Sequence, residues 1–269
     1  GSPCDGPRID SHCFLPSRSA LPSGLVPDPS GRCKNKHRML LCQDITLALC
    51  YSRFMTCRLC LSKAEPFGAR DGGYAECGVC GYIQKTTDRL PREEDEKQRY
   101  LAHHNDPNDP SYRSWMLGFV QTAVLPWLKP GMRVLDFGCG PSTLMEKLVT
   151  QSGMIGSSYD PFFLPETPWS KSQWDAIIMH EVAEHLANPL QTLSMVASCL
   201  KPGGILAIRT AFAPQERSNF LSWWYRLDTT HVGFFRARSL QQWATSQSLV
   251  QVFNNGVDSI TFQDRKTEM

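Results

Sequence analysis

The segment from Met132 to Asp160 constrains the fold more than any other part of the chain. A short apolar run, MRVLDFG, ends in glycine and is followed by GCGPS and by STLMEKLVTQSG, which has the pattern of a helix. A second short run, MIGSSYD, ends in Asp160. Strand, glycine turn, helix, strand and acid in this order predict a parallel α/β sheet that binds a nucleoside at the carboxyl ends of its strands.

The glycines and acids of this segment suit a ligand chemically. Gly138 and Gly140 offer bare backbone that a ligand can approach closely. Asp160 lies 22 positions after Gly138, where an acid grips a ribose diol. Two ligands compete for such a site, a nicotinamide dinucleotide and S-adenosylmethionine. The dinucleotide fingerprint requires glycine three positions after Gly140, and Thr143 stands there instead.

Four segments in a fixed order carry a resemblance to a known family: VLDFGCGPS, YDPFF, WDAIIMHEVAEHL and LKPGGILAIRT. Over about residues 132–250 they resemble class I S-adenosylmethionine-dependent methyltransferases, including a bacterial subgroup in which a zinc ribbon precedes this domain. The resemblance implies an α/β, doubly wound, Rossmann-like sheet with S-adenosylmethionine as cofactor. The residues that it places at the cofactor are Asp136, Gly138, Cys139, Gly140, Asp160, Pro161 and Phe162.

The resemblance also implies a role for each part of this site. Gly138 and Gly140 would approach the methionine part of the cofactor. Asp136 would anchor the loop or the cofactor amine, and Asp160 would hold the ribose hydroxyls. Phe162, or Phe163 beside it in the sequence, would cover the adenine by stacking.

The chain departs from that family at two places. Ser142 stands where the family often has a third glycine. Only 14 residues separate Asp160 from Asp175, where the family usually fits a helix, a third strand and an acidic adenine-binding turn. We therefore expect a sheet that is reduced by one strand at its edge.

The segment HEVAEH carries candidate metal ligands and bases. It is not the H-E-x-x-H motif of metalloproteases, because His180 and His185 are five positions apart and would not share a helix face. In a helix, Glu181, Glu184 and His185 would lie on one face. The segment is similar to E-x-x-E-H patterns in ubiquinone-biosynthesis O-methyltransferases and in small-RNA 3′-terminal 2′-O-methyltransferases. In those, a downstream histidine, matched here by His231, completes a divalent-ion site.

A bound Mg²⁺ or Zn²⁺ would orient an acceptor hydroxyl and lower its pKa. Two alternatives stay open. Glu184 and His185 would instead cap the helix and bond the sheet edge, or His180, at the strand end nearest the transferring methyl, would act as a general base. The catalytic candidates are therefore His180, Glu181 and His231.

Two C-x-x-C pairs, Cys57 with Cys60 and Cys77 with Cys80, stand 16 residues apart. Four thiolates in two such knuckles are the ligands of tetrahedral zinc, so we expect a zinc ribbon at residues 55–86 that depends on its metal. Four free thiols are the alternative. An odd total of 11 cysteines without a secretory signal argues against a disulfide framework and favours the cytoplasm.

Composition divides the rest of the chain. Residues 1–54 are rich in proline, serine and glycine with little apolar periodicity, so we expect a disordered extension. A helical bridge at 87–128 and a methyltransferase domain at 129–262 follow.

No apolar run approaches the roughly 18 residues that cross a bilayer. A net charge of +2 gives no bulk electrostatic case for binding membranes or nucleic acids. We expect a soluble protein.

These patterns together predict methyl transfer to an oxygen or carbon nucleophile of a small molecule. Two other functions stay open: a non-catalytic nucleoside-binding or scaffold domain, and an RNA methyltransferase that contacts RNA through the ribbon. The charges of the ribbon nearly balance, which makes nucleic acid the weaker prediction. They are Arg58, Lys63, Arg70 and Lys85 against Glu65, Asp71 and Glu76. The acceptor and the oligomeric state are not predicted.

Overall fold

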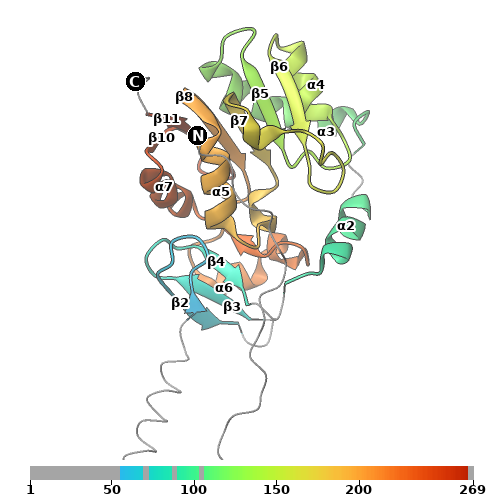
Figure 1. Cartoon of the computed structure of the whole chain (residues 1–269). Coiled ribbons are helices and arrows are strands. Elements are labelled where there is room, and N and C mark those ends of the chain that lie inside the picture. Colours follow the sequence, from blue (N-terminus) through green and yellow to red (C-terminus); the bar gives the residue numbers. More distant parts are fainter. Residues whose placement is uncertain (1–54, 69–72, 87–89, 103–105, 266–269) are drawn as a thin grey trace, which may run out of the picture. The chain divides into compact units, whose positions relative to one another are not determined.

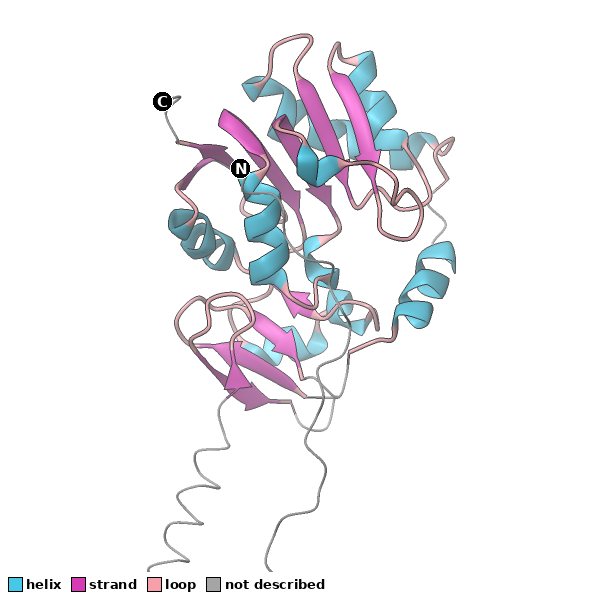
Figure 2. Ribbon diagram, in the orientation of Figure 1, coloured by secondary structure: helices cyan, strands magenta, loops and turns pink. Residues whose placement is uncertain are grey.

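The computed structural model describes residues 55–68, 73–86, 90–102 and 106–265 (Figure 1). The predicted extension, residues 1–54, lies outside them. The described residues form two β-sheets with their flanking helices (Figure 2). Among the described residues, no helix combines the length and the apolar character that spanning a membrane requires.

Six strands form the larger sheet, in the order β10-β11-β8-β7-β5-β6. The four strands from β5 to β8 run parallel, β11 is antiparallel to β8, and β10 is antiparallel to β11. Helices flank this sheet, so the doubly wound α/β sheet expected from the sequence is confirmed. The strands are β5 (Arg133–Phe137), β6 (Ile155–Tyr159), β7 (Trp174–His180), β8 (Leu200–Arg209), β10 (Leu249–Asn254) and β11 (Ser259–Asp264).

One edge of this sheet is β6, in agreement with the predicted loss of a strand. Between β6 and β7 the chain forms only a β-bridge from Asp160 to Leu164 and a short 3₁₀ helix, η6 (Trp169–Lys171). From β5 the chain first continues to β6 and then returns to β7 on the other side of β5. The carboxyl ends of β5 and β7 therefore flank a topological switch point, the place where open α/β sheets bind ligands.

Side chains that alternate along the strands bury both faces of the sheet. In β7, Ile177 and Met179 belong to one core cluster, which includes residues of α5 and α7. Ala176 and Ile178 belong to a second cluster with residues of α3 and α4. Helices thus cover both faces (Figure 1). The helices are α2 (Glu93–Ala102), α3 (Pro110–Phe119), the π-helix η4 (Val120–Val124), η5 (Leu125–Trp127), α4 (Leu144–Gln151), η7 (Ala183–His185), α5 (Pro189–Ser198), α6 (Arg217–Ser222), η8 (Trp224–Leu227) and α7 (Ala237–Ser246).

The smaller sheet is antiparallel, in the order β1-β2-β3-β4-β9. Its first four strands are the predicted ribbon, whereas β9 comes from the C-terminal half of the chain. In β9, Phe234 pairs with Ile83, and Gly233 pairs with Gln84. The sheet of the ribbon is thus completed by a strand that lies far away in sequence. The strands are β1 (Met55–Thr56), β2 (Lys63–Phe67), β3 (Tyr74–Cys77), β4 (Ile83–Lys85) and β9 (Gly233–Phe234).

The four cysteines of the ribbon converge at one point. The Sγ atoms of Cys57 and Cys80 are 3.7 Å apart, those of Cys60 and Cys77 are 3.5 Å apart, and all four lie within 4.8 Å of one another. Four sulfurs at about 2.3 Å from a tetrahedral zinc ion are about 3.8 Å from each other. The amide of Cys80 also donates a hydrogen bond to the Cys77 sulfur. The sulfurs therefore fit a zinc ion.

Arg236 ties the ribbon to the segment that follows β8 of the larger sheet. Its side chain is buried, with 2% exposed, and one Nη donates to the Glu76 carboxylate at 2.6 Å and to the Gly81 carbonyl at 2.9 Å. The other Nη donates to the carbonyls of Pro214 and Gln215. One guanidinium thus bonds two residues of the ribbon and two residues that follow β8.

Candidate active site

The glycine turn after β5 contains two glycines with different surroundings. Both have left-handed backbone, with φ of 83° at Gly138 and 64° at Gly140. A Cβ added to Gly138 would stand 2.6 Å from the side chain of Val182, whereas one added to Gly140 would meet nothing within 4 Å. Of the two bare backbones that the sequence places at a ligand, Gly140 faces open space. Gly138, by having no Cβ, leaves room for the Val182 side chain in the turn that follows β7.

Alanine at these two glycines is expected to have different effects. Gly138→Ala should lower the free energy of unfolding by about 2–4 kcal/mol, because it adds a clash with Val182 to the cost of left-handed backbone. Gly140→Ala should cost only about 1–2 kcal/mol, and it should weaken cofactor binding. Urea denaturation and calorimetry measure the two quantities. Adding Val182→Ala should restore part of the stability lost in Gly138→Ala, and equal losses in both single variants would contradict this account.

Asp160, at the end of β6, holds the glycine turn in place. One carboxylate oxygen accepts a hydrogen bond from the Gly140 amide at 2.9 Å. The other accepts from the amides of Phe162 and Phe163, at 2.8 and 3.1 Å. A carboxylate has about four acceptor positions, so one remains, on the oxygen that faces Gly140. Asp160 therefore stabilises the glycine turn and is also a candidate ligand for a ribose hydroxyl.

Asp136 and Cys139 lie at the same end of β5. Asp136 is 4% exposed, and burial raises the pKa of its carboxyl to about 8, with the charges of Glu146 and Asp160 adding to the effect. Among the described residues, none donates a hydrogen bond to this carboxylate. A cationic ligand group would offset its desolvation. The half-buried Cys139 thiol donates to the Gly140 carbonyl, and burial raises its pKa to about 12.

Glu181, the residue that follows β7, has left-handed backbone with φ of 56°. Such backbone is strained in a non-glycine residue and is concentrated at functional sites. Its carboxylate accepts a hydrogen bond from the Tyr225 hydroxyl at 2.9 Å and lies 3.6 Å from the Arg209 guanidinium. Burial, and then the charge of Glu184, raise the pKa of Glu181 to about 8.

The predicted helix across HEVAEH is wrong. Because Glu181 is left-handed, only the 3₁₀ turn η7 forms there, and an α-helix begins later, at Pro189. Glu181, Glu184 and His185 therefore do not share a helix face. The group of potential ligand atoms that does converge comprises Glu184, His185 and His231, within 4.8 Å of one another.

The two histidines of this group are oriented by backbone carbonyls. Nδ1 of His185 bonds the Thr230 carbonyl at 3.1 Å, and Nδ1 of His231 bonds the Tyr225 carbonyl at 2.7 Å. A carbonyl only accepts, so each Nδ1 carries the proton and each Nε2 keeps its lone pair. Histidines that ligate metals are commonly held in this way.

The Glu184 carboxylate is the third member of the group. It is fully buried. The Tyr225 and Thr210 hydroxyls lie close enough to lower the pKa of this carboxyl, but among the described residues neither oxygen has a hydrogen bond of normal geometry. Nε2 of His185 lies 3.8 Å away. Burial raises the pKa of Glu184 to about 7 and lowers that of His231 to about 3. A buried carboxylate beside two imidazole lone pairs has the donor chemistry of a divalent-ion site.

His180 ends β7 and packs between aromatic rings. Its ring lies 4.5 Å from that of Trp115 and 5.1 Å from that of Phe119, and its Nε2 is buried without a hydrogen-bond partner. Burial, and then the charge of Arg209, lower the pKa of His180 to about 3. An imidazole with so low a pKa is a weak general base, so this environment does not suit the role considered for His180.

Pro161 and Phe162 directly follow Asp160. Pro161 is exposed and Phe162 is half-buried. The ring of Tyr100, on α2, lies 6.0 Å from that of Phe162 and 5.2 Å from that of His185. Tyr100 therefore stands between the turn after β6 and the histidine pair. Sequence reasoning missed it, because a tyrosine in a charged helix carries no distinctive pattern.

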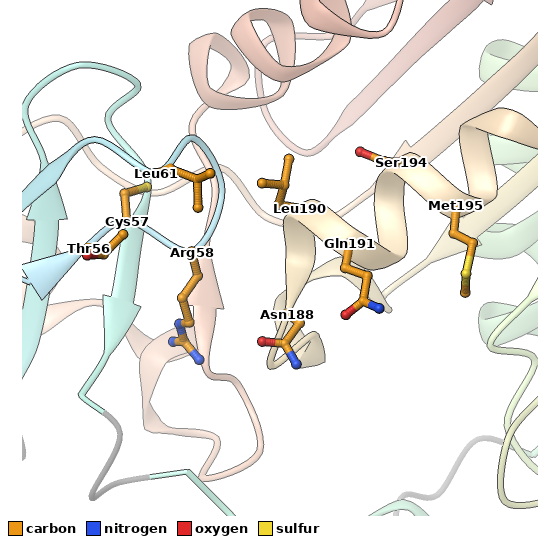
Figure 3. Close-up of a pocket in the computed structure, with 9 residues that line it drawn as sticks. All are labelled: Thr56, Cys57, Arg58, Leu61, Asn188, Leu190, Gln191, Ser194 and Met195. Atoms are coloured by element: carbon orange, nitrogen blue, oxygen red, sulfur yellow. The ribbon is translucent and has the colours of Figure 1, made fainter. Parts of the chain in front are cut away.

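A pocket of about 670 Å³ lies elsewhere, between the first cysteine knuckle and α5 (Figure 3). Arg58 and Leu61 line it from the ribbon, and Leu190 and Met195 line it from α5. None of its lining residues belongs to the glycine turn or to the Glu184 group. The candidate active site consists of the side chains at the switch point and does not include this pocket.

The doubly wound sheet, with a glycine turn and an acid at its switch point, defines the class of nucleoside-binding α/β proteins. A family model described as a methyltransferase domain matches residues 112–249. The match covers more than half of the chain, and the chain belongs to this family.

Curated relatives share a smaller part of the chain. The ubiquinone biosynthesis O-methyltransferase of Cereibacter sphaeroides is 29% identical over 111 residues, which cover 33% of this chain and 44% of that protein. The ribosomal protein L11 methyltransferase of Burkholderia lata is 32% identical over 111 residues, covering 34% and 37%. The chain spans less than half the length of these relatives.

Solved structures show weaker likeness. One is the 1,6-didemethyltoxoflavin-N1-methyltransferase of Burkholderia thailandensis, with bound 1,6-didemethyltoxoflavin and S-adenosylhomocysteine. It is 14% identical with a TM-score of 0.47, and the match covers 76% of this chain and 100% of that one.

Proposed function

We propose that this protein transfers the methyl group of S-adenosylmethionine to an oxygen nucleophile of a small molecule. The observation that carries the proposal is the close approach of the Val182 side chain to Gly138, which leaves no room for a Cβ at that position. It joins the glycine turn of the cofactor side to the segment that bears Glu184 and His185. The methyl donor and the groups that act on the acceptor would then share one switch point.

The cofactor would be held from both sides of the turn. Gly140 leaves room for the methionine part, and the buried Asp136 carboxylate suits its ammonium group. Asp160 has one acceptor position left for a ribose hydroxyl, beyond the three amides that it binds. Phe162 and Tyr100 offer aromatic faces for the adenine.

On the acceptor side, Glu184, His185 and His231 would hold a divalent ion, and their donor set fits one. Such an ion supplies an electrophile that lowers the pKa of an acceptor hydroxyl. Glu181 would stay outside that shell, where its carboxylate accepts a hydrogen bond from the Tyr225 hydroxyl. These residues would mainly position the nucleophile, because S-adenosylmethionine supplies a methyl group that its positive sulfur already activates.

An oxygen acceptor is supported by the Glu184 group and by the partial match to ubiquinone biosynthesis O-methyltransferases. We further propose that zinc occupies the four cysteines of residues 55–86 and has a structural role. All four positions are taken by sulfur, which leaves no open position for chemistry.

The proposal is tested by separating cofactor binding from turnover. His231→Ala and His185→Ala are expected to bind S-adenosylmethionine as the wild type does, measured by calorimetry, and to lose methyl transfer to phenolic and alkyl hydroxyl acceptors. Removing divalent ions should mimic both variants, and Mg²⁺ or Mn²⁺ should restore only the wild type. The zinc content is followed in parallel, so that loss of the ribbon metal is recognised.

Other outcomes would contradict the proposal in distinct ways. No binding of S-adenosylmethionine by the wild type would favour a scaffold role. Activity that survives both histidine substitutions and chelation would refute the divalent-ion site. Unfolding of both variants would assign the histidines to structure.

A further inference from the structure

Arg58, in the first cysteine knuckle, bonds both loops that carry the proposed ion ligands. One Nη donates to the Val232 carbonyl at 2.8 Å and to the Lys85 carbonyl at 3.0 Å. The other Nη donates to the Ala187 carbonyl at 3.2 Å. Val232 directly follows His231, and Ala187 comes two residues after His185. A single guanidinium therefore spans the backbone of the two histidine loops.

The ribbon fixes the position of Arg58. Its amide donates to the side-chain oxygen of Gln84 at 2.8 Å, and the Gln84 amide group donates to the Thr56 carbonyl at 3.0 Å. Gln84 is 2% exposed. The amide of Leu190, in α5, donates to the Arg58 carbonyl at 3.3 Å. Arg58 and Leu190 line opposite sides of the pocket in Figure 3.

The two loops also bond each other and the end of β4. The Val232 amide donates to the Glu184 carbonyl at 2.8 Å. The Nζ of Lys85 donates to the carbonyls of Asp228 and Thr229, at 3.1 and 3.0 Å. The histidine loops are thus held through main-chain carbonyls by side chains of the ribbon, and among its described side chains Arg58 reaches both loops.

We propose that Arg58 is a positioning residue. From its place in the zinc ribbon, it sets the distance between His185 and His231. The ribbon is then a part of the acceptor site and not a separate spacer or lid. A planar guanidinium donates in fixed directions from two nitrogens, whereas the ammonium of lysine is a single point donor. The effect on turnover rests on the proposed function, but the effect on the imidazoles does not.

The test compares Arg58→Gln with Arg217→Gln in the zinc-loaded full chain. Arg217 also joins the ribbon to the rest of the protein, through Glu65 and Glu76, and has no hydrogen bond to either histidine loop. The ¹⁵N signals of the imidazoles report ring environment and tautomer, and His185→Gln and His231→Gln assign them. Arg58→Gln should shift or broaden both signals at unchanged zinc content, and Arg217→Gln should leave them in place.

Turnover gives a second readout. In Arg58→Gln, kcat should fall by about 10- to 100-fold, with an unchanged KM for S-adenosylmethionine, because a misplacement of about 1 Å has effects of this size. Wild-type imidazole signals and wild-type kcat in Arg58→Gln would overturn the proposal. If the wild type transfers no methyl group, the proposed function fails, and the imidazole signals alone decide the role of Arg58.

Arg58→Lys is a second variant, for the case in which Arg58→Gln loses zinc. Lysine keeps the charge and most of the stem but cannot donate to both loops in the same directions. We expect it to retain zinc and to shift at least one of the two imidazole signals. Wild-type signals in Arg58→Lys would overturn the proposal in the same way.

Discussion

Replacing Cys77 with serine is expected to abolish binding of the proposed zinc ion and also methyl transfer, although Cys77 belongs to neither the proposed cofactor site nor the proposed acceptor site. Structural zinc contributes about 10–16 kcal/mol to the folding of small zinc domains. Without it, the ribbon strands would no longer hold β9, which directly follows the His231 loop. Elemental analysis, methyl transfer and hydrogen exchange at the Phe234 amide are the measurements.

The matched control is Cys199→Ser. Cys199 is buried outside the ribbon, and its thiol bonds the Ser170 carbonyl. This variant should keep its zinc, its protection of Phe234 and its activity. A zinc-free Cys77→Ser protein that transfers methyl groups at the wild-type rate would contradict the expected coupling.

Arg236→Met is expected to lower the free energy of unfolding by about 3–5 kcal/mol, because it breaks a buried ion pair and leaves carbonyls without a donor. Those carbonyls belong to Gly81, Pro214 and Gln215. Urea denaturation of the zinc-loaded protein measures the loss. Arg217→Gln is the control: this side chain is 43% exposed and bonds the same Glu76, and its loss should cost about 0–1 kcal/mol. Similar losses in the two variants would be evidence against a special contribution of the buried Arg236 side chain.

The same ion pair predicts a dependence on pH. Burial raises the pKa of Glu76, but the hydrogen bonds from Arg217 and Arg236 outweigh it, so the net pKa is lowered. A carboxyl with a lowered pKa stabilises the folded state fully above its unfolded value, about 4.3, and this contribution is lost as the pH falls further. In Arg236→Met, the loss of stability between about pH 4.5 and pH 3 should be smaller than in the wild type.

The sheet and its switch point were predictable because they depend on local pattern. The glycine turn and the acid at Asp160 mark the ends of β5 and β6, and the short stretch to Asp175 indicated the missing strand. The helix error at Glu181 was partly avoidable. Asn188 followed by Pro189 is a typical helix start and predicts α5 where it begins. The left-handed backbone of Glu181 has no such signal, because glutamate is rarely found there.

The contacts between the ribbon and the acceptor side were not predictable from local pattern. β9 is two residues long, and its partner Ile83 lies about 150 positions earlier in the chain. In the sequence, Arg58 is one charge among several, because its bonds go to main-chain carbonyls, which any residue type provides. The predicted pair His185 and His231 does come together, but the contacts that orient it come from elsewhere in the chain.

The pairing of β9 with β4 has a consequence for how such proteins can be recombined. A chimaera that takes residues 55–86 from another methyltransferase would bring a ribbon edge shaped for a different partner strand. Compatible crossovers must therefore exchange β9 and the Asp228–Val232 loop together with the ribbon, although these segments are remote in the gene. The boundary of the ribbon in the sequence, after residue 86, is therefore not a boundary at which the folded protein can be recombined.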